Sequence, residues 1–163
     1  MLPVYADSTK PLYDKMKPFK TYTFDECYVP VKYHILIDEE KDLLAPIPVE
    51  ALPVPEVDNS ILHAVLTVYM THHQLKTPRE VARRLKLDAR ELSGAIHMLT
   101  GMSHEDFLRQ YRLRAIRELL TGTTLSVQTI ATHFGYSSIH ALNRFLSDQT
   151  SGLSANMIRK QNR

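Results

Sequence analysis

The chain has 163 residues, of which 44% are hydrophobic and 23% charged, and its formal net charge is +2. No apolar run approaches the 18 or so residues of a membrane helix, and the start lacks the basic head and apolar run of a secretory signal, so a membrane protein is excluded. Cys27 is the single cysteine, which rules out an internal disulfide, and a soluble, cytoplasmic protein is expected.

Residues 1–58 form an acidic arm. Residues 1–60 hold 6 Lys plus Arg against 11 Asp plus Glu, whereas residues 61–163 hold 14 against 7. Val31, Tyr33, Ile35 and Ile37 alternate with other residues, as in a half-buried strand, and an earlier strand over Thr21–Cys27 is considered. Two strands alone are marginal in water, so the arm is expected to pack on the helical domain or on another chain.

The end of the arm, about residues 43–58, is rich in proline. Four prolines and no glycine favour an extended, semi-rigid linker. Asp58 or Ser60 is then expected to cap the first helix of the next domain. Two interpretations of the arm stay open: it mediates homodimerisation or docks a partner protein, or it is a flexible tail with transient structure.

A first helix-turn-helix unit is predicted over about residues 77–100. Thr77 suits the N-cap of its first helix, and Pro78 suits the first turn. Asp88 caps the second helix, over about Ala89–Thr100. The inner positions of the two helices are Val81, Ala82, Leu85, Leu92, Ile96 and Leu99. The outer face of the second helix carries Arg90, Glu91, Ser93, Gly94 and His97.

One long helix is predicted from Ser103 to Leu120, with Ser103 and Asp106 at its start and Gly122 at its stop. About 17 residues make a rod of roughly 25 Å. Such a rod could hold two recognition helices near the 34 Å separation of successive major grooves, with no need for a dimer.

A second helix-turn-helix unit is predicted over about residues 126–149. Ile130, Ala131 and Phe134 share one face, and Gly135 suits the tight turn that follows. Ser137 or Ser138 caps the next helix, whose buried stripe is Leu142, Phe145 and Leu146. Its outer face presents Ile139, His140, Asn143 and Arg144. Asparagine can bond an adenine edge and arginine a guanine edge, although two core helices with a solvated face would show the same spacing.

Several motifs then occur in a specific order: Ile130-Ala131, Phe134-Gly135-Tyr136-Ser137-Ser138 and Leu142-Asn143-Arg144-Phe145, preceded by Gly101-Met102-Ser103 and Tyr111-Arg112-Leu113. Over about Asn59 to Arg163 the chain resembles the AraC/XylS family of bacterial transcription regulators. The resemblance implies a mainly α fold, in which a seven-helix domain, residues 59–163, has two helix-turn-helix units joined by a long central helix. A short N-terminal arm with up to two β-strands precedes it.

The resemblance also implies which side chains contact double-stranded DNA. The base-facing set is Arg90, Ser93, Gly94, Ile139, His140, Asn143 and Arg144. Phosphate contacts are expected around Thr77, His97, Arg112 and Ser126. The family usually has a basic residue where Gly94 stands and proline where Ala155 stands.

The function implied is a sequence-specific DNA-binding regulator, an activator that touches RNA polymerase. About 60 residues before the helical domain leave no room for a full ligand-sensing domain. The alternative is a protein-interaction or architectural module that keeps the fold, with the acidic arm docking a partner or masking the DNA face.

Eight histidines invite a metal hypothesis, above all His72-His73 with His63. Adjacent histidines on a helix diverge by about 100°, so no metal site is expected, and the histidines should be solvent-facing or partly packed. No cofactor is expected either. The chain lacks a glycine-rich phosphate loop, a nucleophile elbow and paired carboxylates, so it is not expected to be an enzyme.

Overall fold

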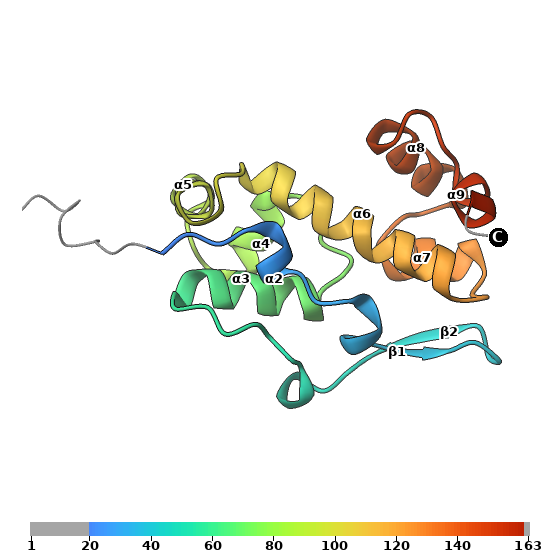
Figure 1. Cartoon of the computed structure of the whole chain (residues 1–163), viewed down its shortest axis with the longest axis horizontal. Helices are drawn as coiled ribbons and strands as arrows, with labels where there is room; N and C mark the ends of the chain where they lie inside the picture. The colour runs from blue at the N-terminus through green and yellow to red at the C-terminus, as the bar shows by residue number, and fades with distance from the viewer. Residues whose placement is uncertain (1–19, 162–163) are drawn as a thin grey trace, which may run out of the picture.

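The computed structural model describes residues 20–161, and they are mainly helical (Figure 1). The arm holds the short helix α2 (Phe24–Cys27) and an antiparallel hairpin, β1 (Ile35–Asp38) and β2 (Leu43–Pro46), with 3-10 turns at Val31–Tyr33 and Val49–Ala51. Seven helices follow: α3 (Ser60–Thr71), α4 (Pro78–Leu85), α5 (Ala89–Thr100), α6 (His104–Gly122), α7 (Val127–His133), α8 (Ile139–Gln149) and α9 (Ala155–Gln161). The predicted fold class is confirmed.

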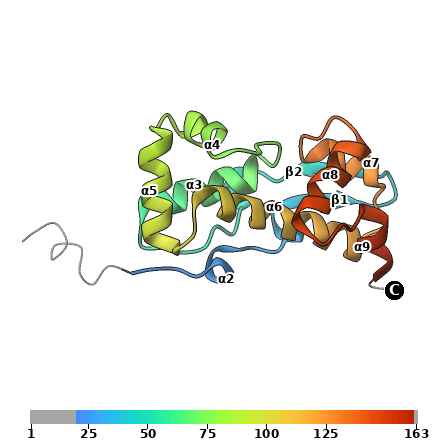
Figure 2. The same cartoon turned by 90° about the horizontal axis from the view of Figure 1, so that it is seen from above.

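The long helix α6 joins two hydrophobic cores. Its first half supplies Phe107 and Tyr111 to a core shared with α3, α4 and α5. Its second half supplies Ile116 and Leu119 to a core shared with α7, α8 and α9. With 19 residues, α6 is about 28 Å long, slightly longer than predicted. The two cores therefore sit at opposite ends of one rod (Figure 2).

Most helix starts lie where the sequence places them, because a side chain that accepts from a free backbone amide fixes the first turn. Thr77 forms a capping box with Glu80, and Asp88, Ser103 and Ser138 cap α5, α6 and α8. The cap of α3 was wrongly assigned to Asp58 or Ser60. Asn59 holds that position, and its Oδ1 accepts from the amides of Ile61 and Leu62, each at 3.0 Å.

The arm differs from the prediction in two places. Residues 24–27, considered as a strand, form α2, because Thr23 and Glu26 make a capping box. Only the end of the alternating segment is a strand, and its partner is Leu43–Pro46, at the start of the proline-rich stretch. Asp42 turns the chain between the strands with a φ of 52°. Pairing with β1 and packing on α7 therefore hold Leu43–Pro46 as a strand, although the composition of this segment suggests a linker.

Residues 20–58 pack along the helical domain. Tyr22 and Tyr28 are buried in the first core, and Val31 and Ile35 are buried in the second. The Glu118 carboxylate of α6 accepts from the Tyr28 hydroxyl at 2.9 Å and from the Val31 amide at 2.8 Å. The arm therefore belongs to both cores, and over the described range it is a packed element rather than a tail.

Among residues 20–161, no helix is both long enough and apolar enough to cross a membrane.

Candidate nucleic-acid interface

The two predicted recognition helices, α5 and α8, lie at opposite ends of α6. Both are on the upper edge of the molecule in Figure 1, whereas the β1–β2 hairpin is on the lower edge. Figure 2 looks down on that upper edge and shows both helices uncovered. The described part of the arm therefore does not mask them.

Side chains on α5 divide between the core and solvent as the periodicity predicts. Leu92, Ile96 and Leu99 are buried. The proposed base-contacting residues Arg90 and Gly94 are exposed, as is His97, and Ser93 is half-buried. An added Cβ at Gly94 would meet nothing within 4 Å, so this position is open to a ligand. Arg90 is the one arginine of α5, and its side chain is exposed.

The outer face of α8 carries Ile139, His140 and Arg144, all exposed, above the buried Leu142 and Leu146. Arg144 can donate two parallel hydrogen bonds, the geometry suited to a guanine edge. Phe145, predicted in the buried stripe, is only half-buried and lies against the ring of Tyr136.

Asn143, predicted to bond adenine, makes a hydrogen bond within the protein. It is half-buried, and its Oδ1 accepts from the amide of Ala155 at 2.8 Å, at the start of α9. Bidentate contact with adenine uses both the oxygen and the nitrogen of the amide, and in this structure the oxygen points to the amide of Ala155. The bond exists because alanine, unlike the proline usual in the family at this position, keeps its backbone N–H.

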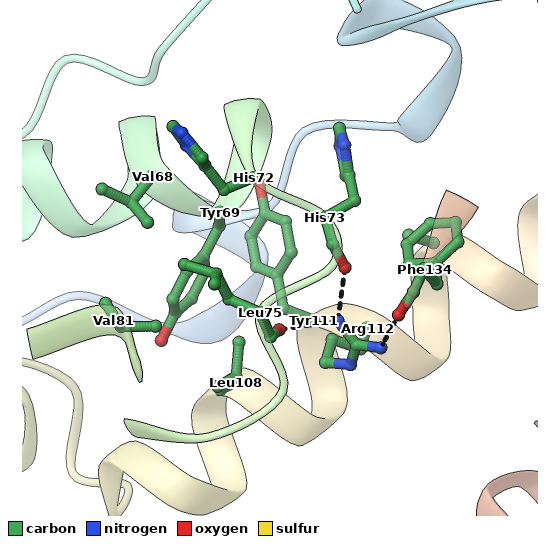
Figure 3. Close-up of a pocket in the computed structure, with 11 residues that line it drawn as sticks. Val68, Tyr69, His72, His73, Leu75, Val81, Leu108, Tyr111, Arg112 and Phe134 are labelled. Atoms are coloured by element: carbon green, nitrogen blue, oxygen red, sulfur yellow. Dashed lines mark hydrogen bonds between the residues drawn. The ribbon is translucent and has the colours of Figure 1, made fainter. Parts of the chain in front are cut away.

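Arg112, predicted to contact a phosphate, lies inside the protein. It is only 3% exposed. Its Nη1 donates to the carbonyls of His73 and Leu75 at 2.5 and 2.7 Å, and its Nη2 donates to the carbonyl of Phe134 at 2.7 Å (Figure 3). The rings of Phe134 and Tyr136 lie 5.7 and 5.3 Å from the guanidinium carbon. A side chain held in this way cannot reach the DNA backbone.

The carbonyls that Arg112 binds lie in the loop that leads into the first helix-turn-helix unit and in the second unit. The loop before α4 supplies two, and the end of α7 supplies the third. The same loop meets the turn of the second unit again, where the Lys76 Nζ donates to the Gly135 carbonyl at 2.7 Å. A Cβ at Gly135 would lie 2.7 Å from the Gln74 carbonyl oxygen. Only glycine allows this close approach, so the two units are fixed against each other as well as through α6.

Ser126, another predicted phosphate contact, is already bound by the arm. Its amide and its hydroxyl donate to the two carboxylate oxygens of Asp42, at 2.8 and 2.7 Å. Glu39 likewise accepts from the amide and the hydroxyl of Thr124. These bonds lower the pKa of both carboxyl groups. The main cause is the bond from the Thr124 amide for Glu39 and the bond from the Ser126 amide for Asp42. Nothing in the sequence pattern links positions so far apart, which is why the prediction missed Asp42.

A group of exposed basic side chains on the first helix-turn-helix unit favours binding of nucleic acid there. Arg79, Arg83, Arg84 and Lys86 on α4 and its exit are all exposed. Exposed basic side chains beside a recognition helix are placed to neutralise backbone phosphates.

The histidines are more deeply buried than predicted: His34, His73 and His104 are in the interior. Among residues 20–161, no group of three or more His, Cys, Asp or Glu side chains could hold a metal ion.

This arrangement of helices is similar to that of known helix-turn-helix proteins. A family model described as a helix-turn-helix domain matches residues 81–161. Among solved structures, the C-terminal domain of AraT, a response regulator from Geobacillus stearothermophilus, is similar, with 26% sequence identity and a TM-score of 0.53. The match covers 62% of this chain and 84% of that one. No curated protein matches the chain.

The position of Arg112 predicts its contribution to stability. Replacing it by methionine should lower the free energy of unfolding by about 3 kcal/mol or more, because three carbonyls between the units lose their donors. Urea denaturation of both proteins measures the difference. The control is Arg117→Met, at an exposed position of the same helix, expected within about 0.5 kcal/mol of the unsubstituted protein. Equal effects of the two substitutions would mean that Arg112 does not join the units.

The bond between Asn143 and Ala155 predicts the outcome of a double-mutant cycle. Asn143→Ala should cost about 1 kcal/mol of stability, as the loss of a helix cap does. In an Ala155→Pro background, which has no amide hydrogen to lose, the same substitution should cost little. Denaturation of the four proteins measures the coupling. Equal stability changes in both backgrounds would mean that the bond between Asn143 and Ala155 contributes nothing to stability.

Proposed function

Because the chain is an AraC/XylS-like regulator with a DNA-binding helix-turn-helix domain, we propose that it binds a specific DNA sequence by inserting α5 and α8 into successive major-groove segments of one duplex. The single observation that carries this proposal is the presentation of both helices, uncovered, at the two ends of α6 (Figure 2). Both recognition helices belong to one chain, so this mode of binding needs no second copy.

The base-contacting residues in this proposal are Arg90, Ser93 and Gly94 on α5, and Ile139, His140 and Arg144 on α8, with His97 near the phosphates. All of them are exposed or half-buried. The two arginines are the strongest candidates, because a guanidinium makes bidentate bonds to guanine. Ser93 and Gly94 would let the helix lie close to the bases, and Ile139 would make apolar contacts with them. The exposed arginines of α4 would add affinity that does not depend on sequence.

Selection from a random DNA pool tests the proposal directly. We expect enrichment of a site with two short conserved blocks, one for each recognition helix, and an affinity that falls steeply as salt rises. In that site, Arg90→Ala and Arg144→Ala should each weaken binding by about 1–3 kcal/mol and relax the preference in a different block. Lys32→Ala, an exposed cation on the arm, is the matched control and should change little. A pool without enrichment would contradict sequence-specific recognition.

We further propose that the regulator is an activator that contacts RNA polymerase through the outer face of the hairpin. Cross-strand partners point to the same side of a sheet, so Leu36, Asp38, Leu43 and Ala45 share this face. Leu36 is 54% exposed and Leu43 is 51% exposed. The hairpin lies on the edge away from α5 and α8, so DNA would leave this face free for a protein partner.

The double substitution Leu36→Ser, Leu43→Ser separates the two activities. It should leave DNA affinity unchanged and lower transcription from a promoter that carries the selected site. In vitro transcription with purified polymerase measures the second effect, and Ile61→Ser, at an exposed apolar position on α3, serves as the control. Full transcription by the double variant would contradict the assigned contact face.

A further inference from the structure

Three histidines from three parts of the fold form one hydrogen-bonded chain. His34 follows the first 3-10 turn of the arm, His73 lies in the loop between α3 and α4, and His133 ends α7 in the second unit. His34 Nδ1 is 2.9 Å from His73 Nε2, and His73 Nδ1 is 3.2 Å from His133 Nε2. At the other end, His34 Nε2 is 3.1 Å from the Val29 carbonyl oxygen. The chain of bonds thus joins the arm to the loop that leads into the first helix-turn-helix unit and to the end of α7 in the second unit.

The carbonyl at one end fixes the direction of the chain. A carbonyl oxygen can only accept, so His34 Nε2 must carry a proton. In a neutral ring the other nitrogen then accepts, which requires His73 Nε2–H, and the same step requires His133 Nε2–H. All three neutral rings are therefore Nε2–H tautomers, and every shared hydrogen bond is satisfied.

The surroundings of the chain disfavour an additional proton. His34 is fully buried, and His73 is 8% exposed. Among the described residues, the ionisable groups that face the rings are Tyr111 and Arg112 from α6 and His72 from the end of α3. None of these is a carboxylate, and Arg112 is already a cation. The chain could shift its tautomers to accommodate one proton, but the resulting charge would have no counterion.

We propose that the three histidines form a proton-sensitive latch, which fastens the arm to both helix-turn-helix units at neutral pH and releases it on acidification. The latch comprises His34, His73 and His133. Release separates the segment around His34 from the loop before α4 and from the end of α7. This inference concerns the arm, so it does not depend on DNA binding.

The direction of the pH effect follows from the difference between the closed and open states. Burial, the main cause, lowers the pKa of His34 to about 4 and that of His73 to about 2, and it also lowers that of His133. In the open state each ring regains an ordinary pKa of about 6.5. The open state therefore binds more protons below about pH 6.5, and the closed state is favoured above it and lost as pH falls.

Hydrogen exchange of the full chain without DNA tests the latch. Between pH 7.5 and 5.5, after correction for intrinsic exchange rates, protection of residues 29–38 should fall about tenfold for each ring that is released. In His34→Gln, His73→Gln, which cannot titrate at these positions, most of that pH dependence should disappear. His63→Gln, an exposed histidine on α3, is the matched control and should behave like the unsubstituted chain. Glu39 and Asp42 stay ionised between pH 5.5 and 7.5, because their pKa values are lowered from the ordinary carboxyl values, so they do not contribute to this pH dependence.

Protection that does not change with pH, or an equal pH dependence in the double variant, would overturn the proposal. Nitrogen-15 spectra of the imidazoles in the unsubstituted chain provide a test that does not depend on variants that fold. At pH 7.5 they should show neutral Nε2–H tautomers for all three residues. A charged ring or an Nδ1–H tautomer there would equally overturn it. Because no DNA is present, either result leaves the proposed function untouched.

Discussion

The relative placement of the two recognition helices depends on one buried cation. A guanidinium without water must bond to protein acceptors, since burial of an unpaired charge is very unfavourable. The two terminal nitrogens of Arg112 bond to carbonyls of the loop before α4 and of the end of α7, and they thereby determine where these two segments can lie. The rod of α6 sets the distance between α5 and α8. The contacts of Arg112 and Lys76 restrict the rotation of one unit about that rod.

The arm adds a second connection along the same rod. Its aromatic residues pack on the first core, its hairpin packs on the second, and Asp42 and Glu39 bond the backbone at the entrance to α7. An acidic segment beside a basic domain suggests masking of the DNA face. The structure instead places two of its carboxylates, those of Glu39 and Asp42, against amides and hydroxyls at the entrance to α7, so the sign difference between the segments is compatible with DNA binding.

Local signals predicted most of the helical domain, because caps, glycine turns and apolar spacing act within a few residues. The errors concern long-range partners. Arg112 follows Leu108 by four residues and precedes Ala115 and Leu119 on the buried face of α6, so its spacing could have indicated an interior position. Its acceptors, however, lie 22 to 39 residues away. Asn143 has the type and face that predict a base contact, and the sequence gives no sign of its bond to the amide of Ala155. Strand β2 starts a proline-rich segment, and only its pairing with β1 shows that these residues form a strand.

The packing of Phe24 and Tyr28 against α6 has a consequence for protein engineering. Their rings lie against Tyr111, and that of Phe24 also against Phe107. A fusion protein that contains only residues 59–163 would expose Phe107 and Tyr111 to solvent, and this exposed aromatic surface would favour aggregation. A transplantable DNA-targeting fragment of this protein should therefore include residues 20–58 as well as the helical domain.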